Sequence, residues 1–210
     1  EKVLKDRSEN PQADILSAMV NARVEGEAPL DTAECLSILQ QLLVAGNETT
    51  ASSICHGMRL LVEDPEQHAL LRAEPERIPN AVEEILRLST PTANMWRVCI
   101  QDTELGGVEI PKGSAMLVRY SAANRDPAIF PDPHRFDVTR ANAGEQLAFG
   151  AGVHFCLGAQ LARMEMAKAF EALLERLPNP RIAQGSPPPE YPPNILLRGM
   201  TALPLEFDPA

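Results

Sequence analysis

Phe149–Glu165 reads FGAGVHFCLGAQLARME, and the rest of the chain is interpreted outward from this segment. It places Cys156 between a loop that contains Gly150 and Gly152 and a proline-free run, Leu157–Leu177, with helical periodicity. Glycine adopts backbone angles closed to other residues, so the loop can turn tightly and approach a flat ligand. The free N–H groups and positive dipole end of a helix N-terminus favour an anion such as a thiolate. The thiolate is the form of cysteine that binds metals, so the segment predicts a thiolate site.

A single cysteine is more often a buried free thiol, and that interpretation stays open on composition alone. The spacing around Cys156 argues otherwise. The pattern Phe-Gly-x-Gly-x-His-x-Cys-x-Gly-x-x-Leu-Ala resembles the heme-ligand signature of the cytochrome P450 family, the heme-thiolate monooxygenases. This resemblance implies that Cys156 binds the iron of heme b (iron protoporphyrin IX) and that Phe149 and Gly150 lie against the cofactor. The pattern is met at Phe149, Gly150, Gly152, His154, Cys156, Gly158, Leu161 and Ala162.

A second long element precedes this segment. Asp31 and Glu34 form an N-terminal capping pattern, and no proline follows until Pro65. The pattern predicts a helix of about 32 residues, which would span roughly 48 Å at 1.5 Å per residue. Few domains can hold such a helix except through their middle, so we expect it to be central.

The centre of that predicted helix, Leu42–Ser53, reads LLVAGNETTASS, in which polar residues and a glycine interrupt an apolar helix. Such local inconsistency is typical of functional sites, although a kinked core helix with a solvated polar face is an equal alternative. The run also matches the oxygen-activating motif of the cytochrome P450 family. The resemblance implies that Thr49 lies beside the dioxygen, that Glu48 takes part in proton delivery, and that Ala45 lines the cofactor pocket.

Glu84 and Arg87 lie three residues apart on one face of a predicted helix, Ile78–Leu88. Taken alone they are a surface ion pair of small energetic value. They also match the family's Glu-x-x-Arg motif. The resemblance implies a buried structural pair that is completed by Arg135, within the segment Pro133–Phe136.

The region 92–118 changes to short strand candidates, Trp96–Ile100, Gly107–Ile110 and Ala115–Val118, which predict a small antiparallel sheet. Arg97 lies in the first of them. By resemblance Arg97 and His154 bind the heme propionates, and a charge-assisted bond between arginine and a carboxylate suits that role. The alternative for Arg97 is a water-exposed arginine at a strand edge. A closing hairpin is expected from Ile195–Leu197 and Ala202–Leu205.

The composition restricts the class of protein. Acidic residues outnumber basic ones 29 to 19, and the net charge of −10 argues against nucleic acid as a partner. Four cysteines without compact disulfide spacing indicate a reducing compartment, and we expect a cytoplasmic protein. No apolar run approaches the roughly 20 residues of a membrane span, and no signal peptide opens the chain, so no membrane association is expected.

The resemblance extends along the whole chain, and the motifs occur in the family's order. It implies a mainly α protein with small antiparallel β-sheets, corresponding to the C-terminal half of the cytochrome P450 fold: the long central helix and the cysteine-loop helix. Residues 1–210 would then be the C-terminal heme-binding portion of a single domain, and the N-terminal half would be missing. That half is one expected partner of the chain.

The implied activity is a monooxygenase that takes O2 as co-substrate and inserts one oxygen atom into an apolar small molecule. A pocket would be lined by Ala45, Ala93, Met95, Ile195 and Leu196. Electrons would come from a ferredoxin-type partner, for which Arg163 is a candidate docking residue or an ordinary exposed arginine.

Two other functions were weighed. The missing half favours a truncated heme-binding or interaction module without catalysis. A cysteine hydrolase that uses Cys156 with His154 fails on geometry, because residues two apart at a loop–helix junction rarely aim at each other and no third orienting group is evident.

Overall fold

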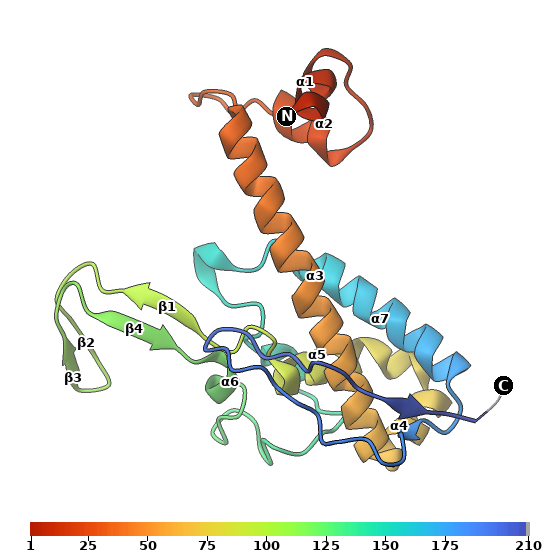
Figure 1. The fold of residues 1–210 in the computed structure, drawn as a ribbon. Coiled ribbons are helices and arrows are strands. Elements are labelled where there is room, and N and C mark those ends of the chain that lie inside the picture. The colour runs from red at the N-terminus through yellow and green to blue at the C-terminus, as the bar shows by residue number, and fades with distance from the viewer. Residues whose placement is uncertain (209–210) are drawn as a thin grey trace. The chain divides into compact units, whose positions relative to one another are not determined.

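The computed structural model describes residues 1–208, and these form a mainly α protein with two-stranded antiparallel sheets (Figure 1). This is the predicted fold class. The chain divides into two compact units, Glu1–Asn47 and Glu48–Ala210, which are described separately below. Over the described residues, no helix is both long and apolar enough to cross a membrane.

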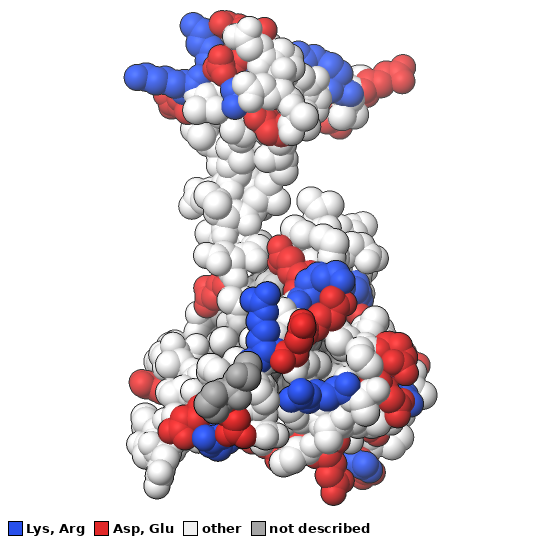
Figure 2. Space-filling model, turned by 90° about the vertical axis from the view of Figure 1, so that its right-hand side faces the viewer, with Lys and Arg blue, Asp and Glu red and all other residues white. Residues whose placement is uncertain are grey.

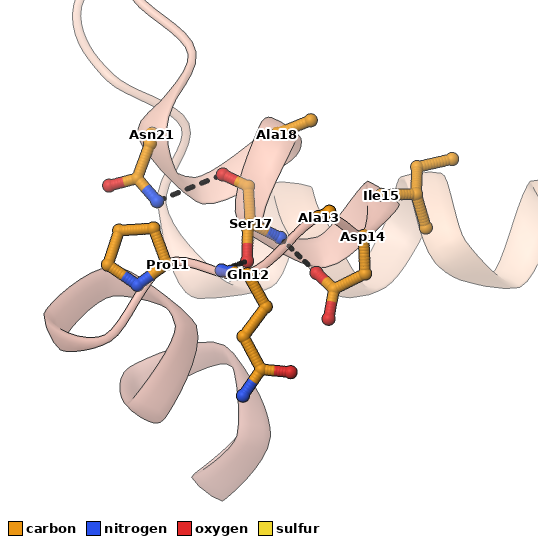
Figure 3. A pocket seen from close by; sticks show the side chains of 8 residues that line it. All are labelled: Pro11, Gln12, Ala13, Asp14, Ile15, Ser17, Ala18 and Asn21. Atoms are coloured by element: carbon orange, nitrogen blue, oxygen red, sulfur yellow. Dashed lines mark hydrogen bonds between the residues drawn. The ribbon is translucent and has the colours of Figure 1, made fainter.

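The first unit contains α1 (Lys2–Glu9), α2 (Ile15–Asn21) and the first part of α3. Asp14 caps α2 by accepting a hydrogen bond from the Ser17 N–H, and the Gln12 N–H donates to the Ser17 hydroxyl, both at 2.8 Å. A shallow, open hollow surrounds this cap (Figure 3). None of the predicted site residues lines it, so it is not the candidate site. Its lining residues are Pro11, Gln12, Ala13, Asp14, Ile15, Ser17, Ala18 and Asn21.

Helix α3 (Thr32–Glu63) has the predicted length of 32 residues. The predicted cap is present, because the Asp31 N–H donates to the Glu34 carboxylate and the Glu34 N–H donates to the Asp31 carboxylate, each at 2.8 Å. The α-helix continues without a break through the polar segment 45–50. The polar residues therefore alter the surface of the helix and leave its backbone pairing intact.

The core of the second unit lies where α5 (Ile78–Ser89) and α7 (Ala159–Arg176) pack against the C-terminal part of α3. Gly57 marks the closest approach. A Cβ atom at Gly57 would lie 2.4 Å from the Phe170 ring and 2.9 Å from Ile85, so only glycine allows these helices to meet. Helix α4 (Pro65–Ala73) and the 3₁₀ turn η1 (Pro75–Arg77) connect α3 to α5.

A buried ion-pair network anchors α5. The Arg87 guanidinium donates to both Glu84 carboxylate oxygens, at 2.7 and 2.8 Å, and both side chains are fully buried. The third member is Arg140, whose Nε donates to Glu84 at 3.1 Å. The prediction of Arg135 in this role was wrong. The Arg135 side chain lies outside the network. Arg135 contributes only its backbone carbonyl, which accepts hydrogen bonds from both Arg87 and Arg140.

The strands form two small sheets between α5 and α7 in the sequence. Strand β1 (Met95–Val98) pairs with β4 (Ala115–Val118) in antiparallel register, with Arg97 opposite Met116. Strand β2 (Thr103–Leu105), which the sequence did not predict, pairs with β3 (Val108–Ile110). The turn between them is Gly106–Gly107, and both glycines have positive φ, as a tight two-residue hairpin requires.

The connection from β4 to α7 is mostly irregular. It contains α6 (Tyr120–Ala123) and the 3₁₀ turns η2 (Ala143–Glu145) and η3 (Gly152–His154). After α7, β5 (Arg181–Ile182) pairs with β6 (Leu205–Glu206).

The predicted closing hairpin of Ile195–Leu197 and Ala202–Leu205 was therefore wrong. The last strand pairs with the segment directly after α7, and Leu197 forms a β-bridge with Thr92 instead.

On the face shown in Figure 2, acidic and basic side chains are interspersed over the described residues of the second unit. No extended basic patch is present on this face among those residues. The distribution on this face agrees with the acidic composition.

The buried side chain of His56 is expected to make the free energy of unfolding depend on pH. It lies buried on α3, and its Nε2 has no hydrogen-bond partner among residues 1–208. Burial, and to a smaller extent the charges of Arg198, Arg59 and Arg125, together lower the pKa of His56 to about 4. The unfolded chain, with a histidine pKa near 6.5, therefore binds a proton that the folded chain excludes.

The contribution of neutral His56 to stability is therefore complete above about pH 6.5 and is lost as the pH falls toward 4. We expect stability to fall by roughly 2 kcal/mol between pH 7.5 and pH 4.5 from this residue. Urea unfolding of the wild type and His56→Gln at both pH values measures it. Equal losses in the two proteins would contradict the assignment to His56.

Candidate functional site

The cysteine loop is held by backbone hydrogen bonds. The Cys156 N–H donates to the Phe149 carbonyl at 2.9 Å, and the Gly150 N–H donates to the Leu147 carbonyl at 2.9 Å. Gly150 and Gly152 have φ values of +70° and +69°, which other residues rarely adopt. The glycines identified in the sequence therefore make the turn that brings Phe149 and Cys156 together.

The thiol of Cys156 is presented outward at the start of α7. Cys156 is exposed and forms no disulfide. A Cβ atom at Gly158, the N-cap residue of α7, would lie 3.9 Å from the Cys156 sulfur, so the sulfur lies beside the helix N-terminus. The predicted helix start was Leu157, but α7 begins at Ala159. The Ala159 N–H donates to the Cys156 carbonyl, so a turn precedes the helix. An exposed thiol beside free N–H groups is suited to bind a metal as thiolate.

The side chains next to Cys156 are apolar and face solvent. Val153 is 99% exposed, Leu157 is 93% exposed and Phe155 is 51% exposed. Three neighbouring apolar side chains exposed to this degree exceed the scattered exposure that is normal for a surface. They indicate a surface that an apolar group or a further segment covers.

Tyr120, which the sequence did not indicate, lies between Arg97 and this loop. The Arg97 side chain is half-buried on β1, and its guanidinium donates to the Tyr120 hydroxyl at 3.4 Å. The same hydroxyl lies 3.6 Å from the position a Cβ would take at Gly150. Among residues 1–208, no carboxylate forms an ion pair with Arg97. The structure thus brings Arg97 to the cysteine loop with its charge available to an anionic group.

His154 and Phe149 lie on the same loop in different environments. His154 is exposed at the end of η3, and within the described chain no hydrogen bond or ion pair joins it to Arg97. Phe149 is half-buried, and its ring centroid lies 6.3 Å from that of Phe155. Arg97 and His154, predicted to act together, therefore occupy two separate positions at one loop.

Thr49 and Glu48 are consecutive residues of α3 in the second unit, whereas Ala45 belongs to the first. Glu48 is exposed and Thr49 is half-buried. Thr49 precedes Gly57, where α3 meets α7, by eight residues, or about 12 Å along the helix. In Figure 1 both α3 and α7 run downward from their N-terminal ends.

The two segments expected to line a pocket, 93–95 and 195–196, lie side by side. The Ala93 N–H donates to the Leu196 carbonyl at 2.8 Å, and the Asn94 side chain donates to the Ile195 carbonyl. Met95 and Ile195 are both exposed. The two segments are therefore neighbours, and their role as the lining of a substrate pocket stays a prediction.

Within residues 1–208, no cluster of three or more histidine, cysteine, aspartate or glutamate side chains could hold a metal ion. An iron ion bound by Cys156 would therefore need its other ligands from a prosthetic group.

The family follows from comparison with known proteins. The sequence model described as "Cytochrome P450" matches residues 1–206. The chain belongs to the cytochrome P450 family. The cysteine loop, the α3 motif and the buried Glu-x-x-Arg pair are therefore this P450 chain's versions of family features.

Relatives and solved structures agree with this assignment. "Putative cytochrome P450 140" of Mycobacterium tuberculosis is 44% identical over 202 residues, covering 95% of this chain and 45% of that relative. "6-deoxyerythronolide B hydroxylase" of Saccharopolyspora erythraea is 43% identical, over 96% of this chain and 50% of that protein. The substrate-free structure of Mycobacterium marinum cytochrome P450 CYP150A6 has a TM-score of 0.94 at 35% identity, covering 100% of this chain and 53% of that one. This P450 chain spans about half the length of these relatives.

The residues present fit a heme. The exposed Cys156 thiol beside a helix N-terminus would supply a ligand to the iron, and Val153 and Leu157 would supply an exposed apolar border. Arg97 supplies a cation without a carboxylate partner in the described chain, as a propionate requires. A flat, apolar, iron-containing group with carboxylate substituents matches each of these three properties.

Proposed function

We propose that the protein is a heme-thiolate monooxygenase that inserts one oxygen atom of O2 into an apolar small molecule. In this proposal residues 1–210 form the C-terminal heme-binding portion of a single P450 domain. The observation that carries the proposal is the exposed Cys156 thiol at the N-terminus of α7, within a chain of the P450 family.

The proximal residues would hold the cofactor. When bound, heme supplies the activation of O2, which protein side chains cannot perform. Cys156 would ligate its iron as thiolate, with the loop fixed by the hydrogen bond from the Cys156 N–H to the Phe149 carbonyl. Arg97 and His154 would bind the propionates, while Phe149 and Gly150 would lie against the macrocycle. The Arg97 guanidinium is oriented by Tyr120, which limits the freedom it loses on binding a carboxylate.

The distal residues would handle protons. Thr49 carries a hydroxyl that can both accept and donate a proton, and Glu48 is an exposed carboxylate next to it. Glu48 can take a proton from solvent, and Thr49 can pass one toward the O2 site and exclude stray water. The roles differ because Thr49 is half-buried and Glu48 is not.

The substrate would be apolar because the segments 93–95 and 195–196 offer Ala93, Met95 and Ile195. Two relatives carry the names of oxygen-inserting enzymes, "6-deoxyerythronolide B hydroxylase" and "Steroid C26-monooxygenase". Electrons would come from a ferredoxin-type protein. Localisation in the cytoplasm would suit four unpaired cysteines.

The carbon monoxide spectrum of the reduced, purified protein tests the proposal. A thiolate-ligated heme gives a strongly red-shifted Soret band. Its appearance is expected in the natural full-length protein. If heme binds without that band, Cys156 is not the ligand and the proposed function fails.

Thr49→Ala provides a prediction about the distal side. We expect about a tenfold loss of product per electron consumed, with the balance released as peroxide, because the variant lacks the hydroxyl that would pass protons toward the O2 site. Heme content should not change. Product, NAD(P)H consumption and peroxide are measured together with Thr49→Ser as the control that retains the hydroxyl. Equal coupling in Thr49→Ala and wild type would exclude the role of Thr49.

A second function, a heme-binding or interaction module without catalysis, is favoured by one observation: the chain spans about half of its relatives. Intact mass with heme content separates the two functions. A protein of 22.9 kDa without heme supports the module, and a protein of roughly twice that mass with one heme supports the enzyme.

A further inference from the structure

We propose that Arg163, held by Glu83, is a positioning residue for the cysteine loop: its guanidinium fixes Phe149 and thereby the backbone that presents Cys156. The inference rests on the proposed function, because Cys156 is taken as the heme ligand. It assigns Arg163 a role different from electron-partner docking.

Glu83 and Arg163 join α5 to α7 through a two-point ion pair. Arg163 Nε donates to Glu83 Oε1 at 2.5 Å, and its NH2 group donates to Oε2 at 3.1 Å. The side chains are 28% and 16% exposed, so the pair is largely shielded from water. A two-point arrangement fixes the plane of the guanidinium as well as its position. Arg163 is therefore held by its own chain.

The fixed guanidinium covers Phe149. The Arg163 Cζ atom lies 4.6 Å from the centroid of the Phe149 ring, within the range of a cation–π contact. Phe149 begins the loop, and its carbonyl accepts the hydrogen bond of the Cys156 N–H at 2.9 Å. A ring held by a cation on a rigid helix leaves this carbonyl little freedom. The contact thus connects α7 to the backbone of Cys156 from outside the loop.

Glu83 also fixes the residues that lead into the loop. The Gln146 side-chain amide donates to Glu83 Oε2 at 3.0 Å, and the Gln146 side-chain carbonyl accepts from the Ala148 N–H at 2.6 Å. The Glu83 carboxylate therefore holds both the Arg163 guanidinium above Phe149 and the chain segment just before Phe149. Loss of Glu83 should release both.

Amide hydrogen exchange of the natural full-length protein, followed by mass spectrometry, tests the proposal. In Arg163→Gln and Glu83→Gln we expect the segment 147–157 to exchange about fivefold to tenfold faster, as for the loss of one cation–π contact and its ion pair. Peptides from α3 and α5 should be unchanged. In carbon monoxide spectra, part of the red-shifted Soret band should move to shorter wavelength, as the thiolate ligand is held less firmly.

Three variants isolate the contact. Lys168→Gln removes an exposed ion pair with Glu171 from the same helix, and it should leave the segment 147–157 unchanged. Glu83→Lys combined with Arg163→Glu restores opposite charges but places a carboxylate over the Phe149 ring, so exchange should stay fast. Arg163→Lys keeps the cation and should restore part of the protection.

Three results overturn the proposal: unchanged exchange in both single variants, a uniform increase over the whole second unit, or full restoration by the charge reversal. These results are independent of the proposed function. If the wild type lacks the red-shifted band, the heme-thiolate assignment fails, while the exchange data still decide whether Arg163 orders the loop.

Discussion

Cys156→Ser is expected to abolish the red-shifted Soret band of the carbon monoxide complex and all monooxygenase activity. A serine hydroxyl is not deprotonated near neutral pH, so it does not replace a thiolate as the axial ligand of iron. The loop itself should persist, because its hydrogen bonds are made by the backbone of Phe149, Gly150 and Cys156. We expect turnover to fall below detection, a loss of at least about 10³-fold.

The matched control is Cys55→Ser, which removes a half-buried thiol from α3 at a position outside the cysteine loop. Its spectrum should equal that of the wild type. A red-shifted band in Cys156→Ser would show that another cysteine binds the iron.

Glu84→Gln is expected to destabilise the fold by about 3–5 kcal/mol, because it leaves buried cations without their carboxylate. Glu84 accepts hydrogen bonds from Arg87, Arg140 and the Asp137 backbone, and both Glu84 and Arg87 are fully buried. Glutamine offers one oxygen and no charge to partners that now use two. Urea unfolding measures the change in the free energy of unfolding.

The control is Glu63→Gln, which removes an ion pair with Arg59 in which the side chains are 48% and 30% exposed. An exposed pair contributes about 0–1 kcal/mol, so this variant should unfold near the wild-type midpoint. Similar losses in Glu63→Gln and Glu84→Gln would contradict the structural role assigned to the buried network.

The sequence predicted those elements whose determinants are local. The length of α3 follows from the Asp31–Glu34 cap and from Pro65, and both are visible without tertiary information. The turn at Cys156 follows from glycines at positions that require positive φ. The resemblance is the source of the roles proposed for Cys156, Thr49, Glu48 and Arg97. For these residues the structure gives their exposure and the elements on which they lie.

What the sequence missed depends on irregular backbone and on distant contacts. Arg140, and not Arg135, reaches Glu84. The sequence could not predict this, because the segment 131–142 follows no helical or strand period from which a side-chain direction could be read. Tyr120 lies on a helix of four residues, too short for a periodic pattern, although it connects Arg97 to the loop. The pairing of β5 with β6 joins segments that are more than 20 residues apart, and turn signals do not specify such pairs.

Gly57 has a consequence for the proposed active site although it contacts none of its residues. It sets the distance between α3 and α7 at their crossing, since a Cβ there would lie 2.4 Å from Phe170. Thr49 precedes Gly57 on α3, and Cys156 lies in the loop just before α7 begins at Ala159. A small change of angle between the two helices at Gly57 is enlarged toward their N-terminal ends. The room that the proposed function needs for a substrate beside Thr49 would thus depend on a buried glycine, which has no side chain to adjust.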